Sequence, residues 1–157
     1  MLENLTLNVV QEVYVAAGIQ ATFSALLAQL GPHNDLPDGN PMPMKLEAWP
    51  GGRWYRDLGS ENGDVWGNVR AINRPTILEI TGQLFMDFSL SSQVTYRLKA
   101  VEQQTVVSFR YVRYGLIQND ERAKIEKQWT RLNLNIRMWA ETHPFPVARA
   151  SDARPFR

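Results

Sequence analysis

The stretch WPGGRWYRD, residues 49–57, places three aromatic and two arginine side chains around one Pro-Gly-Gly turn. Side chains alternate between the two faces of a strand, so Trp54 and Arg56 share one face while Arg53 and Tyr55 share the other. The aromatic side chains could fill a core or cover a subunit interface, because large aromatic residues are usually buried. The alternative is a pocket lined by Trp54, in which Arg56 supplies a charged or hydrogen-bonding end.

Four charged residues within predicted strands could also do chemistry. Arg110 and Arg113 lie on opposite faces of FRYVRYG (109–115), and arginine can bind a carboxylate through two parallel hydrogen bonds. The alternative is a solvated strand face with surface ion pairs, which contribute little to stability. Glu47 and Glu79 lie among apolar residues, where a buried carboxylate would have a raised pKa and could act as an acid or base. The alternative is that both side chains point outward from their strands.

Metal-dependent and nucleophilic chemistry have little support in the sequence. The two histidines, His33 and His143, lack a second metal ligand at a recognised spacing, and the chain has no cysteine. Neither a GxSxG motif nor a phosphate-binding glycine loop occurs. We therefore expect no cofactor and no bound metal, and we favour a binding protein over an enzyme while leaving catalysis open.

Composition excludes several kinds of partner. The chain has 157 residues, a net charge of +1 and no cysteine. That charge is far too small for a typical nucleic-acid-binding domain, so no nucleic-acid partner is expected. The N-terminus lacks a signal-peptide pattern, and no apolar run is long enough to cross a membrane. We therefore predict one domain of a cytoplasmic protein with no membrane span.

The elements that must position these residues follow from hydrophobic periodicity. Alternation predicts a strand over 5–15, and helical spacing then predicts a helix from Ile19 that stops at Gly31-Pro32. A loop rich in proline and turn-forming residues follows at 33–43. Six more strands are predicted at 44–49, 53–58, 64–73, 76–82, 92–101 and 105–114.

A long helix is predicted from about residue 120 to 141, with Asn119 or Asp120 as its cap. Its apolar stripe consists of Ile125, Trp129, Leu132, Ile136 and Trp139. Short connections make the strands antiparallel neighbours, and this helix is the one element long enough to cover their apolar face. The fold class is therefore α+β.

Several segments, in this order along the chain, resemble the SRPBCC superfamily of START-like and birch-allergen-like proteins. They are AAGIQATFSALL (16–27) after the first strand, KLEAWPGGRWYRDLG (45–59), GDVWGNVRAINRPTILEITG (63–82), VTYRLKAVEQQTVVSFRY (94–111) and the tryptophan-bearing final helix. The resemblance covers about residues 5–141 and is nearest to the branch of chaperone-ATPase-activator-like and polyketide cyclase-like domains. One departure is Gln128, since relatives often have glycine directly before the helix tryptophan, here Trp129.

The resemblance implies a helix-grip fold. In this fold a curved seven-stranded antiparallel sheet wraps around the long C-terminal helix, two short helices near the N-terminus close one end, and a cavity lies between sheet and helix. Family members bind sterols, lipids or other hydrophobic molecules there, some carry out cyclisation or dehydration, and some act on a chaperone. We expect one such domain over 1–142, followed by a tail at 143–157 that is mobile or packs as an extended arm.

We predict that the chain binds a small hydrophobic or amphipathic molecule in this cavity. An empty apolar cavity of ~300 Å³ would cost about 7 kcal/mol, so it must hold a ligand, water or inward aromatic side chains. The predicted lining residues are Trp54, Trp66, Phe85, Tyr96, Phe109, Trp129 and Leu132, with Arg56 and Asn133 as polar contacts. The aromatic ones other than Trp54, together with Phe88 and Tyr111, could equally fill the cavity.

Two alternatives belong to other functional classes. A chaperone-cofactor-like module, which binds a protein partner, would use an exposed patch around Arg53, Tyr55, Arg110 and Val112. A cyclase- or dehydratase-like enzyme would need a buried polar cluster facing the cavity, which the sequence does not assemble. A homodimer is also considered, because the strands carry aromatic residues on both faces.

Overall fold

The computed structural model describes residues 5–84, 91–115 and 117–144. Within these residues seven strands form one antiparallel sheet in the order β1-β7-β6-β5-β4-β3-β2, accompanied by two helices. The elements in chain order are β1 (Thr6–Val15), α1 (Ile19–Leu30), β2 (Lys45–Leu46), β3 (Arg53–Gly59), β4 (Asn62–Asn73), β5 (Ile77–Gly82), β6 (Ser91–Val101), β7 (Gln104–Tyr114) and α2 (Asn119–Thr142). The predicted α+β, helix-grip architecture is confirmed.

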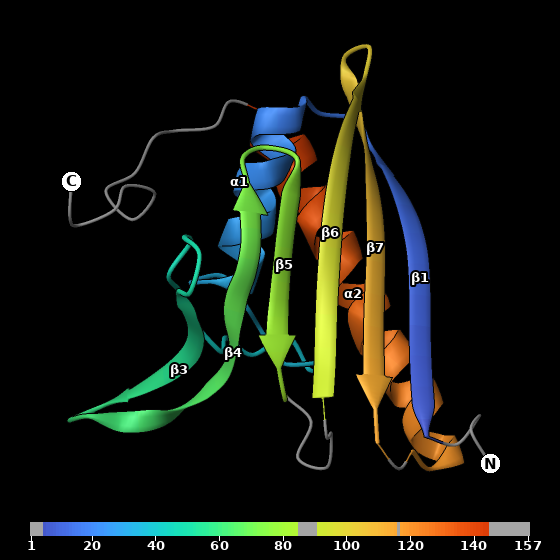
Figure 1. Cartoon of the computed structure of the whole chain (residues 1–157). Coiled ribbons are helices and arrows are strands. Elements are labelled where there is room, and N and C mark those ends of the chain that lie inside the picture. Colours follow the sequence, from blue (N-terminus) through green and yellow to red (C-terminus); the bar gives the residue numbers. More distant parts are fainter. Residues whose placement is uncertain (1–4, 85–90, 116, 145–157) are drawn as a thin grey trace.

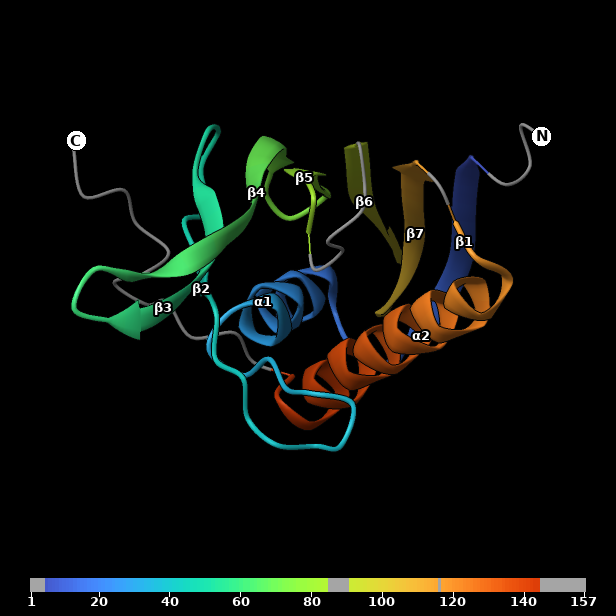
Figure 2. The ribbon, with the colours of Figure 1, turned by 90° about the horizontal axis from the view of Figure 1, so that it is seen from below.

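Both helices lie on the same side of the sheet, and the core fills the space between them and the strands (Figures 1 and 2). Alternation on β7 buries every second side chain from Thr105 to Arg113 on the face toward the helices, as the period of a strand requires. The stripe on α2 faces this surface: Ile125, Trp129 and Ile136 are buried, whereas Leu132 and Trp139 are partly buried.

The N-terminus of α2 differs slightly from the predicted one. Gln118, rather than Asn119 or Asp120, is the N-cap, and it forms a capping box with Glu121. In this arrangement each side chain bonds the backbone N–H of the other residue, so two N–H groups that lack helical partners are satisfied together. The helix ends at His143 as expected, where the His143 N–H donates to the carbonyl of Trp139.

Two predicted elements are shorter or absent. Only one short helix, α1, lies before the strand-rich part of the described chain, and the segment 31–44 has turns and an isolated bridge between Asp35 and Pro41 instead of a second helix. The strand predicted at 44–49 pairs only at Lys45–Leu46. The chain turns after it, because the Trp49 N–H donates to Glu47 and the Gly52 N–H donates to Trp49.

The β3–β4 hairpin extends away from the helices beyond the rest of the sheet (Figures 1 and 2). Its pairing shifts register between Trp54 and Tyr55 and again between Asp57 and Gly59. The first shift falls at Trp66, an extra residue on β4, and the second at Leu58, an extra residue on β3. Trp54 is buried, whereas the β3 residues from Asp57 onward are exposed.

Some expectations fall outside the described residues. Phe85, Phe88 and the tail from residue 145 onward belong to this group. Within the described part, no helix is long and apolar enough to span a membrane.

Candidate functional site

A pocket of about 280 Å³ opens between the loop after α1, the base of the β3–β4 hairpin and the middle of α2. Its walls are predominantly apolar, which is typical of sites for small organic molecules. The lining residues are Asn34, Asp35, Leu36, Pro37, Met42, Trp54, Trp66, Gln128, Trp129, Arg131 and Leu132.

Three tryptophans form the aromatic part of this wall. Trp54 and Trp66 meet edge to face with ring centroids 5.3 Å apart. The indole Nε1 of Trp54 donates to the carbonyl of Leu30 at 2.7 Å, and that of Trp66 donates to Asp64 at 2.7 Å. Trp129 comes from the opposite side, on α2. The orientation of the two strand tryptophans is therefore set by hydrogen bonds as well as by packing.

The loop wall is attached to α2 by an ion pair. Arg131 Nη1 donates to the Asp35 carboxylate at 2.7 Å, and Nη2 donates to the Asp35 carbonyl at 3.1 Å. The enclosed Arg131 Nε has no hydrogen-bond partner among the described residues. Since the side chain of Asp35 neutralises this guanidinium, the pocket as a whole is better suited to an apolar group than to a free anion.

Four of the predicted ligand-binding residues lie together in this wall. Trp54, Trp66, Trp129 and Leu132 line the pocket. Phe109 lies behind it, with its ring 5.2 Å from that of Trp129. The predicted Phe85 is outside the described residues, and the remaining three predicted contacts lie elsewhere.

Arg56 does not reach the pocket. Its Nε donates to the Asp64 carboxylate at 3.1 Å, and both side chains are well exposed on the projecting hairpin. Arg56 stays on the same face of β3 as Trp54, but it lies farther out on the hairpin and pairs with Asp64 of β4 instead of reaching the pocket.

Tyr96 and Asn133 belong instead to a polar chain between the sheet and α2. The Tyr96 hydroxyl donates to Asn133 Oδ1 at 2.7 Å, and Asn133 Nδ2 donates to Gln11 Oε1 at 2.8 Å. Gln11 Nε2 then donates to the Thr130 hydroxyl at 2.7 Å. Burial raises the pKa of Tyr96 well above its usual value, so the hydroxyl remains a donor. These groups satisfy one another, and none of them lines the pocket.

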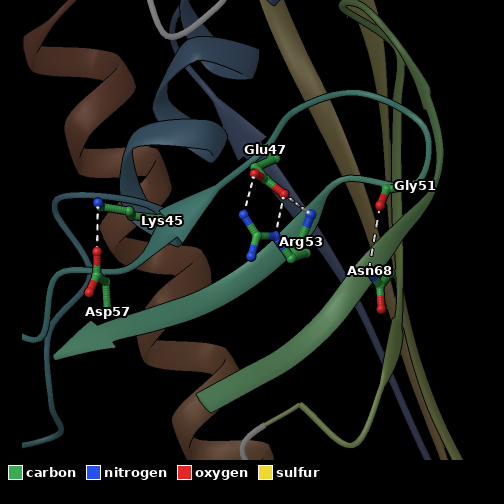
Figure 3. A network of polar contacts seen from close by, with 6 residues as sticks. All are labelled: Lys45, Glu47, Gly51, Arg53, Asp57 and Asn68. Carbon is green, nitrogen blue, oxygen red and sulfur yellow. Dashed lines mark hydrogen bonds and ion pairs between the residues drawn. The ribbon is translucent and has the colours of Figure 1, made fainter. Parts of the chain in front are cut away.

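Glu47 is held by Arg53 at the corner formed by WPGGR. Figure 3 shows the two side chains facing each other: Arg53 Nε and Nη2 donate to the two carboxylate oxygens at 2.8 Å each. The backbone N–H of Arg53 adds a third bond at 2.8 Å. These hydrogen bonds lower the pKa of Glu47, so it is an ionised structural carboxylate rather than the neutral acid considered from the sequence.

Glu79 is buried, but it is also paired. It lies on the face of β5 opposite Leu78 and Ile80, where Arg70 donates to one oxygen at 2.6 Å and Thr95 to the other at 3.2 Å. Because both of its carboxyl oxygens are bonded, Glu79 serves the structure and offers no free acid or base to the pocket.

No group of three His, Asp or Glu side chains within the described residues could hold a metal ion. Both histidines instead pack against Trp139. The centroid of the His33 ring lies 4.3 Å from the centroid of the Trp139 ring, and the His143 ring, with its centroid 4.1 Å away, stacks almost parallel to the indole.

The exposed patch considered for a protein partner is divided in the structure. Arg53 and Tyr55 lie on β3, whereas Arg110 and Val112 lie on β7, and β4, β5 and β6 separate the two strands. The Arg53 guanidinium packs over the Tyr55 ring at 4.5 Å. These four residues therefore do not form one contiguous surface.

Sequence reasoning missed the loop wall and two helix residues. Asn34, Asp35 and Met42 come from a segment without periodicity, and loops often carry binding residues that no pattern marks. Gln128 directly precedes Trp129 and Arg131 directly precedes Leu132, both of which were predicted to line the pocket. This adjacency in the sequence is the one feature from which the two residues could have been predicted.

No protein-family model matches the sequence, and no curated protein matches it. Solved structures do resemble it. The allergen Ara h 8.0201 superposes with a TM-score of 0.65 at 13% identity, covering 87% of this chain and 99% of the other. The di-domain ARO/CYC StfQ from the steffimycin biosynthetic pathway gives 0.62 at 9% identity, covering 90% and 51%. The Aha1 dimer from Colwellia psychrerythraea gives 0.60 at 16% identity, covering 86% and 96%.

At these identities the likeness establishes the fold alone. The chain shares the helix-grip fold with these structures, and this is the fold that the order of its sequence segments predicted.

Proposed function

We propose that this chain binds a small apolar or amphipathic molecule in the pocket between β3, β4, the loop after α1 and α2. The observation that carries the proposal is the wall itself, in which Trp54, Trp66, Trp129 and Leu132 surround about 280 Å³ of space. Burial of apolar ligand surface against this wall would supply roughly 25 cal/mol for each Å² removed from water.

The size of the pocket limits the ligand. Apolar cavities of about 150 Å³ bind benzene, and pockets for drug-sized ligands begin at about 300 Å³. A space of about 280 Å³ therefore suits a molecule of up to about three rings or a short alkyl chain. This is smaller than the sterols that the family resemblance includes.

The two alternatives have weaker support. A cyclase-type activity would need polar groups in the pocket that are free to act, whereas the polar chain around Tyr96 and Asn133 is internally bonded behind it. A chaperone-cofactor role draws on the likeness to the Aha1 dimer, but the surface considered for it is divided between two distant strands.

The test is titration with N-phenyl-1-naphthylamine, a neutral dye whose fluorescence rises in apolar surroundings. Leu132→Trp should fill the pocket and weaken dye binding by about tenfold or more. Leu134→Trp is the matched control, because Leu134 lies on the same helix and is 45% exposed. Circular dichroism would verify that both variants are folded.

Unchanged dye affinity in a folded Leu132→Trp variant would place the dye elsewhere and contradict the proposal. Native mass spectrometry of the chain, purified without organic solvent, identifies the natural ligand independently. A mass that disappears on denaturation would reveal its chemical class, and the same spectrum would show whether the chain is a dimer.

A further inference from the structure

Arg113 is the one arginine of the described chain that lies fully inside the fold. It is 1% exposed, on the same inward face of β7 as Phe109 and Tyr111. Its neighbours across the sheet are Leu7 on β1 and Ser92 on β6. An arginine is almost never buried to this extent without a partner, because removal of a charge from water is costly.

The partner of Arg113 is a poor one. Its Nη1 lies 3.7 Å from Glu121 Oε2, which is an ion-pair distance but too long for a hydrogen bond. Its enclosed Nε has no hydrogen-bond partner among the described residues. Glu121 is itself engaged in the helix cap, where Oε2 also accepts the Gln118 N–H at 3.4 Å. By comparison, the exposed Arg53 makes two bonds of 2.8 Å to Glu47.

Arg113 follows Tyr111, which packs against the pocket residue Trp129, on the inward face of β7. Tyr111, two residues earlier on the same face, has its ring 5.0 Å from that of Trp129, and Trp129 lines the pocket. The Tyr111 hydroxyl lies 3.4 Å from the Ser92 hydroxyl. Burial raises the pKa of Tyr111, so this hydroxyl stays protonated at neutral pH. The Tyr111 hydroxyl and the buried cation of Arg113 are therefore the polar groups that follow the Trp129 contact along this face of β7.

We infer that the ligand is an amphipathic carboxylate, with its headgroup bound by Arg113 and its apolar part in the pocket beside Trp129. This inference rests on the proposed function and adds the chemical class of the ligand. A carboxylate matches the planar fork of a guanidinium, so it would satisfy the Nε donor that the protein leaves without a partner. The positive end of α2 would add to the attraction, because the first turn of this helix lies beside Arg113.

The test compares octanoate with octan-1-ol as competitors of N-phenyl-1-naphthylamine. The two have the same chain length, so their affinity ratio isolates the headgroup. Octanoate should bind about 10- to 100-fold more tightly, the range expected for hydrogen bonds to a charged group. Equal affinities would overturn the inference and leave the proposed function standing, whereas failure of both ligands and the dye to bind would overturn both.

Variants then assign the effect to Arg113. Arg113→Gln should remove the preference for octanoate while the affinity for octan-1-ol is kept. Arg110→Gln is the control on the exposed face of the same strand, and Arg131→Gln tests the other arginine near the pocket. Loss of the preference in Arg131→Gln instead of Arg113→Gln would overturn the assignment.

A fourth variant serves if Arg113→Gln does not fold. Glu121→Gln keeps the acceptor oxygen that the capping box needs and removes the charge that competes for Arg113. It should tighten octanoate binding about threefold or more and leave octan-1-ol unchanged, in line with the electrostatic coupling of nearby charges. An unchanged affinity for octanoate in this variant would show that Arg113 serves only as the structural partner of Glu121.

Discussion

The indole Nε1 of Trp54 donates a 2.7 Å hydrogen bond to the backbone carbonyl of Leu30, inside the core. Leu30 is the last residue of α1, and the final carbonyls of a helix have no partner within the helix. A strand side chain thus caps the C-terminus of a helix 24 residues earlier in the chain. The same ring lines the pocket, so one residue couples the placement of α1 to the shape of the site.

Trp54→Phe should therefore destabilise the fold although an aromatic ring is retained. The Leu30 carbonyl would be left buried without this donor, which costs about 1–3 kcal/mol. Urea unfolding followed by circular dichroism measures the change. Trp49→Phe is the control, since Trp49 is half-buried at the same corner and should have the smaller effect. Equal losses in the two variants would show that packing, and not the hydrogen bond, explains the role of Trp54.

The Glu47–Arg53 pair should make the stability of the fold depend on acid pH. Hydrogen bonds from Arg53 lower the pKa of Glu47 below the ordinary value of 4.5. A carboxylate whose pKa is lower in the folded state stabilises the fold above its unfolded pKa, and this contribution is lost as pH falls through the folded pKa. Urea unfolding at about pH 6 and about pH 3.5 should show a larger loss for the wild type than for Glu47→Gln. Identical losses would contradict the assignment.

Gly52 should tolerate no side chain. A Cβ at this position would lie 1.8 Å from the backbone carbonyl oxygen of Glu47, which no rotation of a side chain can relieve. Gly52→Ala should therefore cost at least about 2 kcal/mol in urea unfolding. Gly18→Ala is the matched control, because a Cβ there meets nothing within 4 Å, and its effect should stay below about 1 kcal/mol. A mild effect at Gly52 would mean that the corner can open.

Most strands and both helices could be predicted from hydrophobic periodicity, because an element that buries one face must carry apolar residues at regular spacing. Strand β7, predicted at 105–114, is Gln104–Tyr114, and the helix predicted from about residue 120 to 141 is Asn119–Thr142. The strand predicted at 44–49 is shorter in the structure. Backbone hydrogen bonds of a turn, rather than burial of alternate residues, determine the course of the chain after Leu46. Local patterns do not contain such information.

The site was only partly predictable for related reasons. Large aromatic residues tend to be buried, and Trp54, Trp66 and Trp129 do lie together in the wall of the candidate pocket. Arg56 does not line the pocket because it pairs with Asp64 across the projecting hairpin, and no pattern in the sequence marks this pair. Arg113 illustrates the opposite case: alternation placed it on one of two faces, but its burial and weak pairing depend on where α2 packs.

The buried bond between Tyr96 and Asn133 gives the last prediction. Tyr96→Phe should cost about 1–3 kcal/mol near neutral pH, because Asn133 Oδ1 loses the hydroxyl that donates to it at 2.7 Å. Tyr14→Phe is the control, since the Tyr14 hydroxyl bonds Glu12 at the exposed surface, and its effect should lie within about 0.5 kcal/mol.

Alkaline pH supplies a second readout for the same variant. Burial raises the pKa of Tyr96 well above 10.0, so the unfolded chain releases this proton at a pH where the folded chain keeps it. Stability from a raised pKa is complete below the unfolded value and is lost as pH rises beyond it. Urea unfolding between about pH 8 and about pH 11 should thus show a smaller decline for Tyr96→Phe than for the wild type. If the two declines were equal, Tyr96 would ionise as readily in the folded chain as in the unfolded one, and the hydroxyl could not be the buried donor that joins the sheet to α2.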